Sequence, residues 1–271
     1  MGFKEFEIKL IENNRFLRKC KFMMSNKTSL GNNNLEADNI HFSNNRILMK
    51  GERQELKCAS TSFLRDCIIT IDGSKNIITI DDESEVYGSS GSSFYVEGNN
   101  NKIIIGKNCK IRNSSFMIHG NNNQIFIGDN ISCFGAEFDL RQDNNQIIVG
   151  KNSSFHGRDG YPVHIVADEG KNVLIGEDCM FSKDIQIRTS DSHSIVDLTG
   201  MRLNPAEDVV IGEHVWISLG VTLLKGSNIP GHSVVAADAV CTKAYQEEHC
   251  IIAGNPAKII KHDIDWDRKF V

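Results

Sequence analysis

The sequence predicts an all-β fold in which short parallel strands coil repeatedly around one axis. A first observation is an internal repeat: GNNNKIIIG at 98–106 returns as GNNNQIFIG at 120–128 and, in part, as DNNQIIVG at 143–150. A second is that the chain divides into units of six residues from Ile211 onward, each opening on an aliphatic residue. Short repeated units that stack on their neighbours are typical of a solenoid.

The repeats of the first half each begin with a Gly/Asn turn. Asn and Gly accept positive φ angles, and Asn amides bond to neighbouring backbone, so GNNN predicts a tight turn. The KIIIG and QIFIG segments that follow are short and β-branched, which favours strands over helices. Because Asn recurs at equivalent turns, we expect its side chains to form hydrogen-bonded ladders between successive coils.

The six-residue units of the second half read IGEHVW, ISLGVT, LLKGSN, IPGHSV and VAADAV. Their first position is aliphatic and their fifth is small or β-branched, so we expect both to point inward. The same spacing fits four earlier units, which begin at Ile105, Ile127, Val149 and Ile175. Cys109 and Cys179 then occupy fifth positions and are expected to be small core residues.

Composition excludes several classes of protein. A net charge of −5 over 271 residues argues against a nucleic-acid-binding surface. No apolar run approaches the roughly 18 residues that span a membrane, and the acidic start MGFKEFEIKLIE is unlike a signal peptide. The eight cysteines are irregularly spaced and form no CxxC pair, which favours free thiols in a reducing compartment. We therefore expect a cytoplasmic protein.

The hexads resemble those of the hexapeptide-repeat left-handed β-helix acyltransferases, in the branch of sugar and capsular-polysaccharide O-acetyltransferases that is similar to galactoside and maltose O-acetyltransferases. The resemblance is sharp over about 170–262 and softer over about 68–170. It implies an Asn-rich N-terminal cap or irregular early coils over 1–67 and a left-handed β-helix over 68–256 with a loop insertion at 190–206. Apolar residues with helical spacing (Ile259, Ile260 and Ile264) predict a short helical cap over 257–271.

The largest break in the repeat indicates where the chemistry lies. It contains His193 in TSDSHSI, 23 residues before Trp216 in HVWISLG. In the family that the chain resembles, a His in such a loop is the general base. A histidine with a pKa of about 6.5 accepts the proton of a sugar hydroxyl as its oxygen attacks a thioester. The resemblance also implies a backbone N–H at the Trp216 step as the oxyanion donor. Asp191 is expected either to orient His193 or to bind acceptor hydroxyls.

The donor site is carried over from the same resemblance, which implies acetyl-CoA and no metal. Contacts to the pantetheine arm fall on Leu219 and Ala237, and the phosphate end falls near Thr242, Lys243, Lys258 and Lys261. Lysine suits phosphate as a point charge. The chain departs from the family in two places, with AADA (236–239) where Gly-Ala-Gly is frequent and with Leu219 where a small residue is usual.

The sequence thus predicts an acetyl-CoA-dependent O-acetyltransferase acting on a surface polysaccharide or related glycan, with a homotrimer implied by the resemblance. An N-acyltransferase on an amino-sugar nucleotide and a non-enzymatic binding solenoid remain alternatives. A zinc enzyme of the γ-carbonic-anhydrase type needs a pair of His about five residues apart, and the closest pair in the coils, His156 and His164, is eight apart. His214 and His232 are expected to be exposed coil residues.

Overall fold

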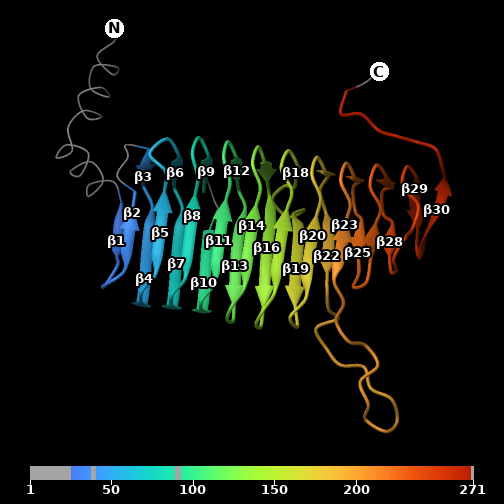
Figure 1. Ribbon diagram of the computed structural model, residues 1–271, viewed down its shortest axis with the longest axis horizontal. Coiled ribbons are helices and arrows are strands. Elements are labelled where there is room, and N and C mark those ends of the chain that lie inside the picture. Colours follow the sequence, from blue (N-terminus) through green and yellow to red (C-terminus); the bar gives the residue numbers. More distant parts are fainter. Residues whose placement is uncertain (1–25, 38–40, 89–92, 270–271) are drawn as a thin grey trace.

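A computed structural model describes residues 26–37, 41–88 and 93–269. Over these ranges the chain winds as a parallel β-solenoid, with coils stacked along one long axis and a long loop leaving the stack near its C-terminal end (Figure 1). This confirms the predicted all-β solenoid. Within the same ranges, no helix is long and apolar enough to span a membrane.

Three parallel sheets form the faces of the solenoid, called A, B and C in the order in which the chain meets them. Sheet A contains β1 (Lys27–Ser29), β4 (Arg46–Glu52), β7 (Ile68–Ser74), β10 (Ser93–Asn99), β13 (Ser115–His119), β16 (Ala136–Arg141), β19 (Val163–Asp168), β22 (Ile185–Arg188), β25 (Thr222–Leu223) and β28 (Val240–Cys241). Sheet B contains β2 (Asn34–Glu36), β5 (Glu55–Cys58), β8 (Ile77–Ile80), β11 (Lys102–Ile105), β14 (Gln124–Ile127), β17 (Gln146–Val149), β20 (Asn172–Ile175), β23 (Val209–Ile211) and β26 (Asn228–Ile229).

Sheet C completes each coil and carries the C-terminal hairpin. It contains β3 (Phe42–Ser43), β6 (Phe63–Arg65), β9 (Glu85–Tyr87), β12 (Lys110–Arg112), β15 (Ser132–Phe134), β18 (Ser154–His156), β21 (Met180–Phe181), β24 (Trp216–Ile217), β27 (Val234–Val235), β29 (Ile251–Gly254) and β30 (Ala257–Lys261). The turns between the sheets form three edges, which we call AB, BC and CA after the strands that they join.

The interior of the solenoid is filled by the residues that the repeat predicts. The first positions of the hexads from Ile211 to Val235 are at most 2% exposed, and the fifth-position residues Cys109 and Cys179 are fully buried. Phe116 stacks between Phe94 and Phe138, with ring centroids 4.9 and 5.1 Å apart. Burial of a side chain of this size contributes about 1.5–3 kcal/mol to the free energy of folding, so these stacked phenylalanines stabilise the solenoid.

The Asn ladders are confirmed at the AB edge. Asn123 N–H donates to Asn101 Oδ1 at 2.9 Å, and Asn145 N–H donates to Asn123 Oδ1 at 2.8 Å, with all three side chains buried. Gly98 precedes this ladder with a φ of 115°, where a Cβ atom would lie only 1.9 Å from the carbonyl oxygen of Gly120. The Gly and Asn of GNNN therefore have separate roles, close approach between coils and bonding between coils.

The cysteines are unpaired where the structure describes them. Seven of them, all but Cys20, lie in the described ranges as buried free thiols. Burial raises the pKa of Cys133 to about 12, so its thiol is protonated and inert at neutral pH.

The two ends of the solenoid differ from expectation. The early coils are regular rather than irregular, because β3 already pairs with β6 and β4 with β7 in the register of the later coils. Residues 1–25, part of the range predicted to form a cap, lie outside the described residues. The division of the chain at 67 and 256 stays a prediction.

The predicted C-terminal helix is wrong over the residues that the structure describes. Residues 257–261 form β30, which pairs antiparallel with β29 and places Ile259 opposite Ile252. The hairpin gives the backbone of β29 a second partner, which a helix would have left as an open sheet edge. The apolar spacing of Ile259, Ile260 and Ile264 was therefore a poor guide, since only Ile259 packs against the core.

Candidate active site

A long loop replaces the AB turn between β22 and β23. Most AB turns need only a few residues, whereas this connection runs from Thr189 to Asp208 and hangs away from the coils (Figure 1). The insertion predicted at 190–206 therefore coincides with the loop. His193 and Asp191 lie in its first part, close to the solenoid.

The loop base is held by Asn204, which is only 7% exposed. Its amide Nδ2 donates to Asp191 Oδ2 at 2.7 Å and to the carbonyl oxygen of His193 at 2.8 Å. Its Oδ1 accepts from the backbone N–H of Ile195 at 2.6 Å. These three bonds join the outgoing and returning arms of the loop, and they fix the backbone on both sides of His193.

A second anchor joins the loop to the preceding AB turn. Arg202 donates to both carboxylate oxygens of Glu169, at 2.5 and 2.9 Å, and the Ser190 hydroxyl donates to the same carboxylate. These hydrogen bonds lower the pKa of Glu169 to about 2, and the bond from Arg202 has the largest effect. The anion is thus firmly held at neutral pH, and its charge draws the returning arm onto the coil.

Asp191 is a structural anchor in this arrangement. Its Oδ2 accepts from Lys225 Nζ at 2.5 Å, and Lys225 belongs to the AB turn of the next coil. The bonds from Lys225 and from Asn204 lower the pKa of Asp191. Among the described residues, no hydrogen bond joins Asp191 to the His193 ring. Of the two roles expected for Asp191, direct orientation of His193 is therefore not seen, and it positions the loop backbone through Asn204.

His193 presents an exposed ring on this anchored backbone. Ser192 before it has a φ of 63°, and the Ser192 N–H donates to the Ser190 hydroxyl at 2.9 Å. Within the described chain, the His193 imidazole has no hydrogen-bonded partner. Its two nitrogen atoms are therefore open to a substrate, which is the condition that a general base requires.

Trp216 opens β24 of sheet C, and its backbone contradicts one expectation. Its N–H donates to the carbonyl oxygen of Ser233 at 2.9 Å, and the Ser218 N–H donates to Val235 at 3.0 Å. Both amides belong to the sheet, so the backbone N–H expected to hold the oxyanion is already occupied. The indole side chain, 36% exposed, is the part of Trp216 that faces outward.

The predicted donor residues lie on different edges. Leu219 and Ala237 stack at the CA edge of neighbouring coils, where Asp238 N–H donates to the Leu219 carbonyl at 2.9 Å. Thr242 and Lys243 follow β28 at the AB edge, and both are exposed.

The remaining two lysines lie on the terminal hairpin. Lys258 and Lys261 belong to β30, opposite Ala253 and Ile251, with exposed side chains. One copy of the chain therefore does not bring the six donor residues into one groove, nor His193 and Trp216 into one site.

Sequence reasoning missed the residues that anchor the loop. Glu169, Arg202, Asn204 and Lys225 come from three separate stretches, and only Arg202 and Asn204 gave a signal, as polar residues in an otherwise apolar part of the loop. Their meeting depends on the coil register, which places the AB turns of successive coils next to one another.

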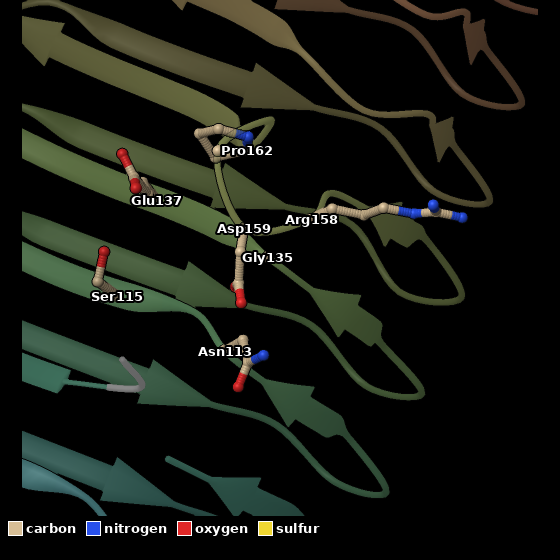
Figure 2. Close-up of a pocket in the computed structure, with 8 residues that line it drawn as sticks. Asn113, Ser115, Gly135, Glu137, Arg158, Asp159 and Pro162 are labelled. Carbon is tan, nitrogen blue, oxygen red and sulfur yellow. The ribbon is translucent and has the colours of Figure 1, made fainter. Parts of the chain in front are cut away.

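A hollow of about 270 Å³ lies at the CA edge, away from the loop. The CA turn 157–162 is longer than the neighbouring CA turns and projects over them. The residues that line the hollow include Asn113, Ser115, Gly135, Glu137, Asp159 and Pro162. Figure 2 shows Arg158 extending away from Ser115 and Glu137. The hollow is open and polar, and it lies on a different edge from His193.

Comparison with known proteins places the chain in a family. No described family profile matches the chain. A polysialic acid O-acetyltransferase of Neisseria meningitidis is 39% identical over 182 residues, which cover 67% of this chain and 82% of the relative. The chain belongs to the family of the polysialic acid O-acetyltransferases. It is therefore an acyltransferase by descent, and its solenoid matches the left-handed β-helix of that family.

Other members of the family are also similar. The polysialic acid O-acetyltransferase of Escherichia coli O1:K1 is 40% identical over 98 residues, although the match spans 36% of this chain and only 32% of that protein. The crystal structure of the polysialic acid O-acetyltransferase OatWY superposes with a TM-score of 0.69 at 36% identity, covering 75% of this chain and 92% of that one. The structure of the polySia-specific acetyltransferase NeuO gives a TM-score of 0.57 at 26% identity, covering 91% and 90%.

Proposed function

We propose that this protein transfers an acetyl group from acetyl-CoA to a hydroxyl group of a sialic-acid-containing capsular polysaccharide. The observation that carries the proposal is the 39% identity over 82% of the meningococcal polysialic acid O-acetyltransferase. The second support is the anchored loop with an open imidazole, because a glycan hydroxyl needs a base to become a nucleophile near neutral pH.

His193 acts as the general base in this proposal. Its neutral imidazole accepts the proton of the sugar hydroxyl while the oxygen attacks the thioester carbonyl carbon. The tetrahedral intermediate then expels the thiolate of coenzyme A, which takes the proton back from the imidazolium. The new ester stays on the glycan, so that one C–O bond forms, one C–S bond breaks and the base is regenerated. No covalent acyl-enzyme is required.

Trp216 contributes through its side chain rather than through its backbone. Since its amide is bonded to Ser233, the N–H of the partly exposed indole is the donor that remains at this position. An indole nitrogen is a donor only, which suits a developing oxyanion. We therefore place the oxyanion near the indole ring.

The donor acetyl-CoA is held by Leu219, Ala237, Thr242, Lys243, Lys258 and Lys261 in this account. The net-acidic chain needs local cations for the phosphates, and the three lysines are exposed and free of acidic partners among the described contacts. Lys243 Nζ lies 5.8 Å from the centre of the Tyr245 ring, a cation–π contact that leaves its charge available to a phosphate. Leu219 and Ala237, exposed side by side on successive coils, offer an apolar edge to the pantetheine arm.

A homotrimer completes the site. His193 leaves the AB edge, whereas Trp216 follows the BC edge, so the two residues meet only if different copies supply them. The loop beyond His193 also exposes a set of apolar side chains to solvent, at fractions from 52% to 108%: Ile195, Val196, Leu198, Met201 and Leu203. A neighbouring copy would bury this apolar loop surface.

The proposal is tested by coenzyme A release from acetyl-CoA in the presence of different acceptors. Polysialic acid, a neutral polysaccharide and an amino-sugar nucleotide are offered to the wild type, to His193→Ala and to His119→Ala, a matched exposed histidine of sheet A. We expect release with polysialic acid, a loss of about 10²–10⁴-fold in His193→Ala and no loss in His119→Ala. Release with the amino-sugar nucleotide alone would make the N-acyltransferase the better account, and full activity in His193→Ala would refute the role of the loop.

A further inference from the structure

The C-terminal segment after β30 lies across the BC edge of the solenoid. It runs back over the coils on the side opposite the long loop (Figure 1). Trp266 is 9% exposed, and its indole N–H donates to the carbonyl oxygen of His214 at 2.8 Å. Arg268 continues the contact one coil further, bonding to the Asp178 carboxylate at 3.0 Å, and it reaches the Ser154 hydroxyl of the coil beyond at 2.7 Å. The segment is thus an ordered clasp, which we call the C-terminal clasp (residues 262–269).

Beneath the clasp, three histidines stack at equivalent turns of the BC edge. His214, His232 and His249 all have left-handed backbones, with φ of 50, 53 and 55°. The His214 and His232 ring centroids are 5.2 Å apart, and those of His232 and His249 are 4.7 Å apart. The expectation that His214 and His232 are exposed coil residues is therefore wrong, since their side chains are only 22% and 32% exposed.

Two of these histidines and one residue of the clasp direct ligand atoms at a common point. His214 Nε2 lies 3.4 Å from Asp265 Oδ1, and His232 Nδ1 lies 3.8 Å from the same oxygen. All three atoms are within 4.8 Å of one another. A tetrahedral zinc ion with bonds of about 2.0–2.2 Å sets its ligand atoms about 3.4 Å apart, so the distance between His214 and Asp265 already fits and His232 would move closer to Asp265 when the ion binds.

The His214 ring is already held in the orientation that a metal ligand requires. His214 Nδ1 lies 2.6 Å from Asp178 Oδ2, which holds a proton on Nδ1 and turns Nε2 toward the triad. Asp178 is itself held by Arg268 of the clasp. A carboxylate behind a histidine is the arrangement that fixes the tautomer and raises the basicity of a metal-bound imidazole.

His232 has one ring nitrogen whose surroundings also point to a cation. Its Nδ1 is buried and has no hydrogen-bond partner in the described part of the chain. A buried polar atom without a partner is uncommon in a folded protein and calls for an explanation. A cation at the centre of the triad would satisfy this nitrogen, whereas the bonds of His214 to Asp178 and to the Trp266 carbonyl leave it unpaired.

We propose that His214, His232 and Asp265 bind a zinc ion that fastens the C-terminal clasp to the coils. The Trp266 carbonyl oxygen, 3.0 Å from His214 Nε2, lies where a fourth ligand would be, and a proton shared between these two atoms would leave when the ion binds. Imidazole and carboxylate ligands suit zinc among the common divalent ions. The ion would also fix Trp266, whose ring stacks on His214 at 4.3 Å and lies 6.1 Å from Trp216.

Metal binding to the tag-free, full-length protein tests this proposal independently of its activity. The protein is freed of metal with a chelator and titrated with Zn²⁺ against a chromophoric competitor. His232→Asn removes a ligand, and His249→Asn is its matched control, because both positions have the left-handed backbone that Asn tolerates. Circular dichroism establishes that each variant is folded.

We expect one zinc ion per chain in the wild type and in His249→Asn, at least 100-fold weaker binding in His232→Asn, and about 10–100-fold weaker binding in Asp178→Asn. Zinc should also slow tryptic cleavage after Arg268 in the wild type. Equal binding by the wild type and His232→Asn would overturn the site. Absence of binding to the wild type would also overturn it, and the bonds of His214 to Asp178 and Trp266 would then suffice to hold the clasp.

Discussion

At the residue scale, the bonds around His193 fix its backbone and leave its ring free. Asn204 bonds to the His193 carbonyl, while Asp191 and Glu169 hold the two arms of the loop through Lys225 and Arg202. A base on a mobile loop would have to be ordered when the substrate binds, and that ordering costs free energy. In this protein the loop is already ordered before the substrate binds.

The ion pair of Glu169 predicts a specific dependence of stability on pH. The folded pKa of Glu169 is about 2, below its ordinary value of 4.5, so its contribution is complete above pH 4.5 and is lost as the pH falls toward 2. Replacing Glu169 with Gln should lower the free energy of unfolding by about 1 kcal/mol at pH 7, because water partly screens the half-buried pair. The difference from wild type should vanish near pH 2.

Denaturant unfolding between pH 2 and 7 measures this difference. Glu177→Gln is the control, since Glu177 pairs with Lys151 at 3.2 Å and both side chains are more than half exposed. The control should match the wild type at every pH. A Glu169→Gln variant that is equally destabilised at pH 2 and pH 7 would show that the loop is held by packing rather than by this carboxylate.

Individual residues show how far the sequence could be trusted. His193 and Trp216 are identifiable because they lie beside a break in a strict repeat, and the inward place of Cys109 and Cys179 follows from the hexad. The occupied amide of Trp216 was not predictable, since it depends on the hydrogen-bond register between coils. The stacked histidines had a signal that was overlooked: His214 and His232 are 18 residues apart, which is three hexads and therefore one coil.

At the element scale, the Asn turns stabilise the solenoid by bonding one coil to the next. Asn123 is fully buried, donates to the Gln142 carbonyl at 2.7 Å and accepts from Asn145 N–H at 2.8 Å. The side chain of Asn121, two residues earlier in the same turn, donates from Nδ2 to Asp143 Oδ1 at 3.0 Å and accepts from the Asn99 N–H at 3.0 Å, but it is partly exposed. The bonds of the Asn123 and Asn121 side chains, which we call the two rungs, differ mainly in their access to water.

This difference predicts unequal losses when the rungs are removed. Asn123→Ala removes the bond to the part-buried Gln142 carbonyl and leaves the Asn145 N–H buried without a partner, so the free energy of unfolding should fall by about 2–4 kcal/mol. Asn121→Ala should cost less than about 1 kcal/mol, because water replaces the lost bonds. Urea unfolding of the two variants measures the losses, and equal values would mean that the ladder is not a buried hydrogen-bond network.

The elements also show where local patterns mislead. The strands and turns of the coils were predictable because the repeat states the same pattern many times. The segment 257–261 is not repeated elsewhere in the chain, and its apolar spacing suited a helix. Without this segment, however, sheet C would have an open edge at β29. Pairing with that edge prevailed over the local spacing, a choice that depends on the neighbouring strand and not on residues 257–261 themselves.

At the scale of the whole molecule, the arrangement of edges explains why one chain is not a complete enzyme in this account. The loop with His193 lies on one side of the coil stack, and the C-terminal clasp beside Trp216 lies on the other (Figure 1). A trimer would bring the loop of one copy to the Trp216 side of the next. The zinc ion proposed under the clasp would then stabilise the wall that the neighbouring loop approaches.

Acetyl transfer to a sialic-acid polymer is best tested by examining the polymer itself. Polysialic acid is incubated with the protein and acetyl-CoA labelled with ¹³C in the acetyl group, repurified, and examined by NMR, with the meningococcal relative as a parallel positive control. We expect ¹³C acetyl esters on the polymer with the wild type and none with His193→Ala. A polymer that stays unlabelled by this protein, while the relative labels it, would contradict the account.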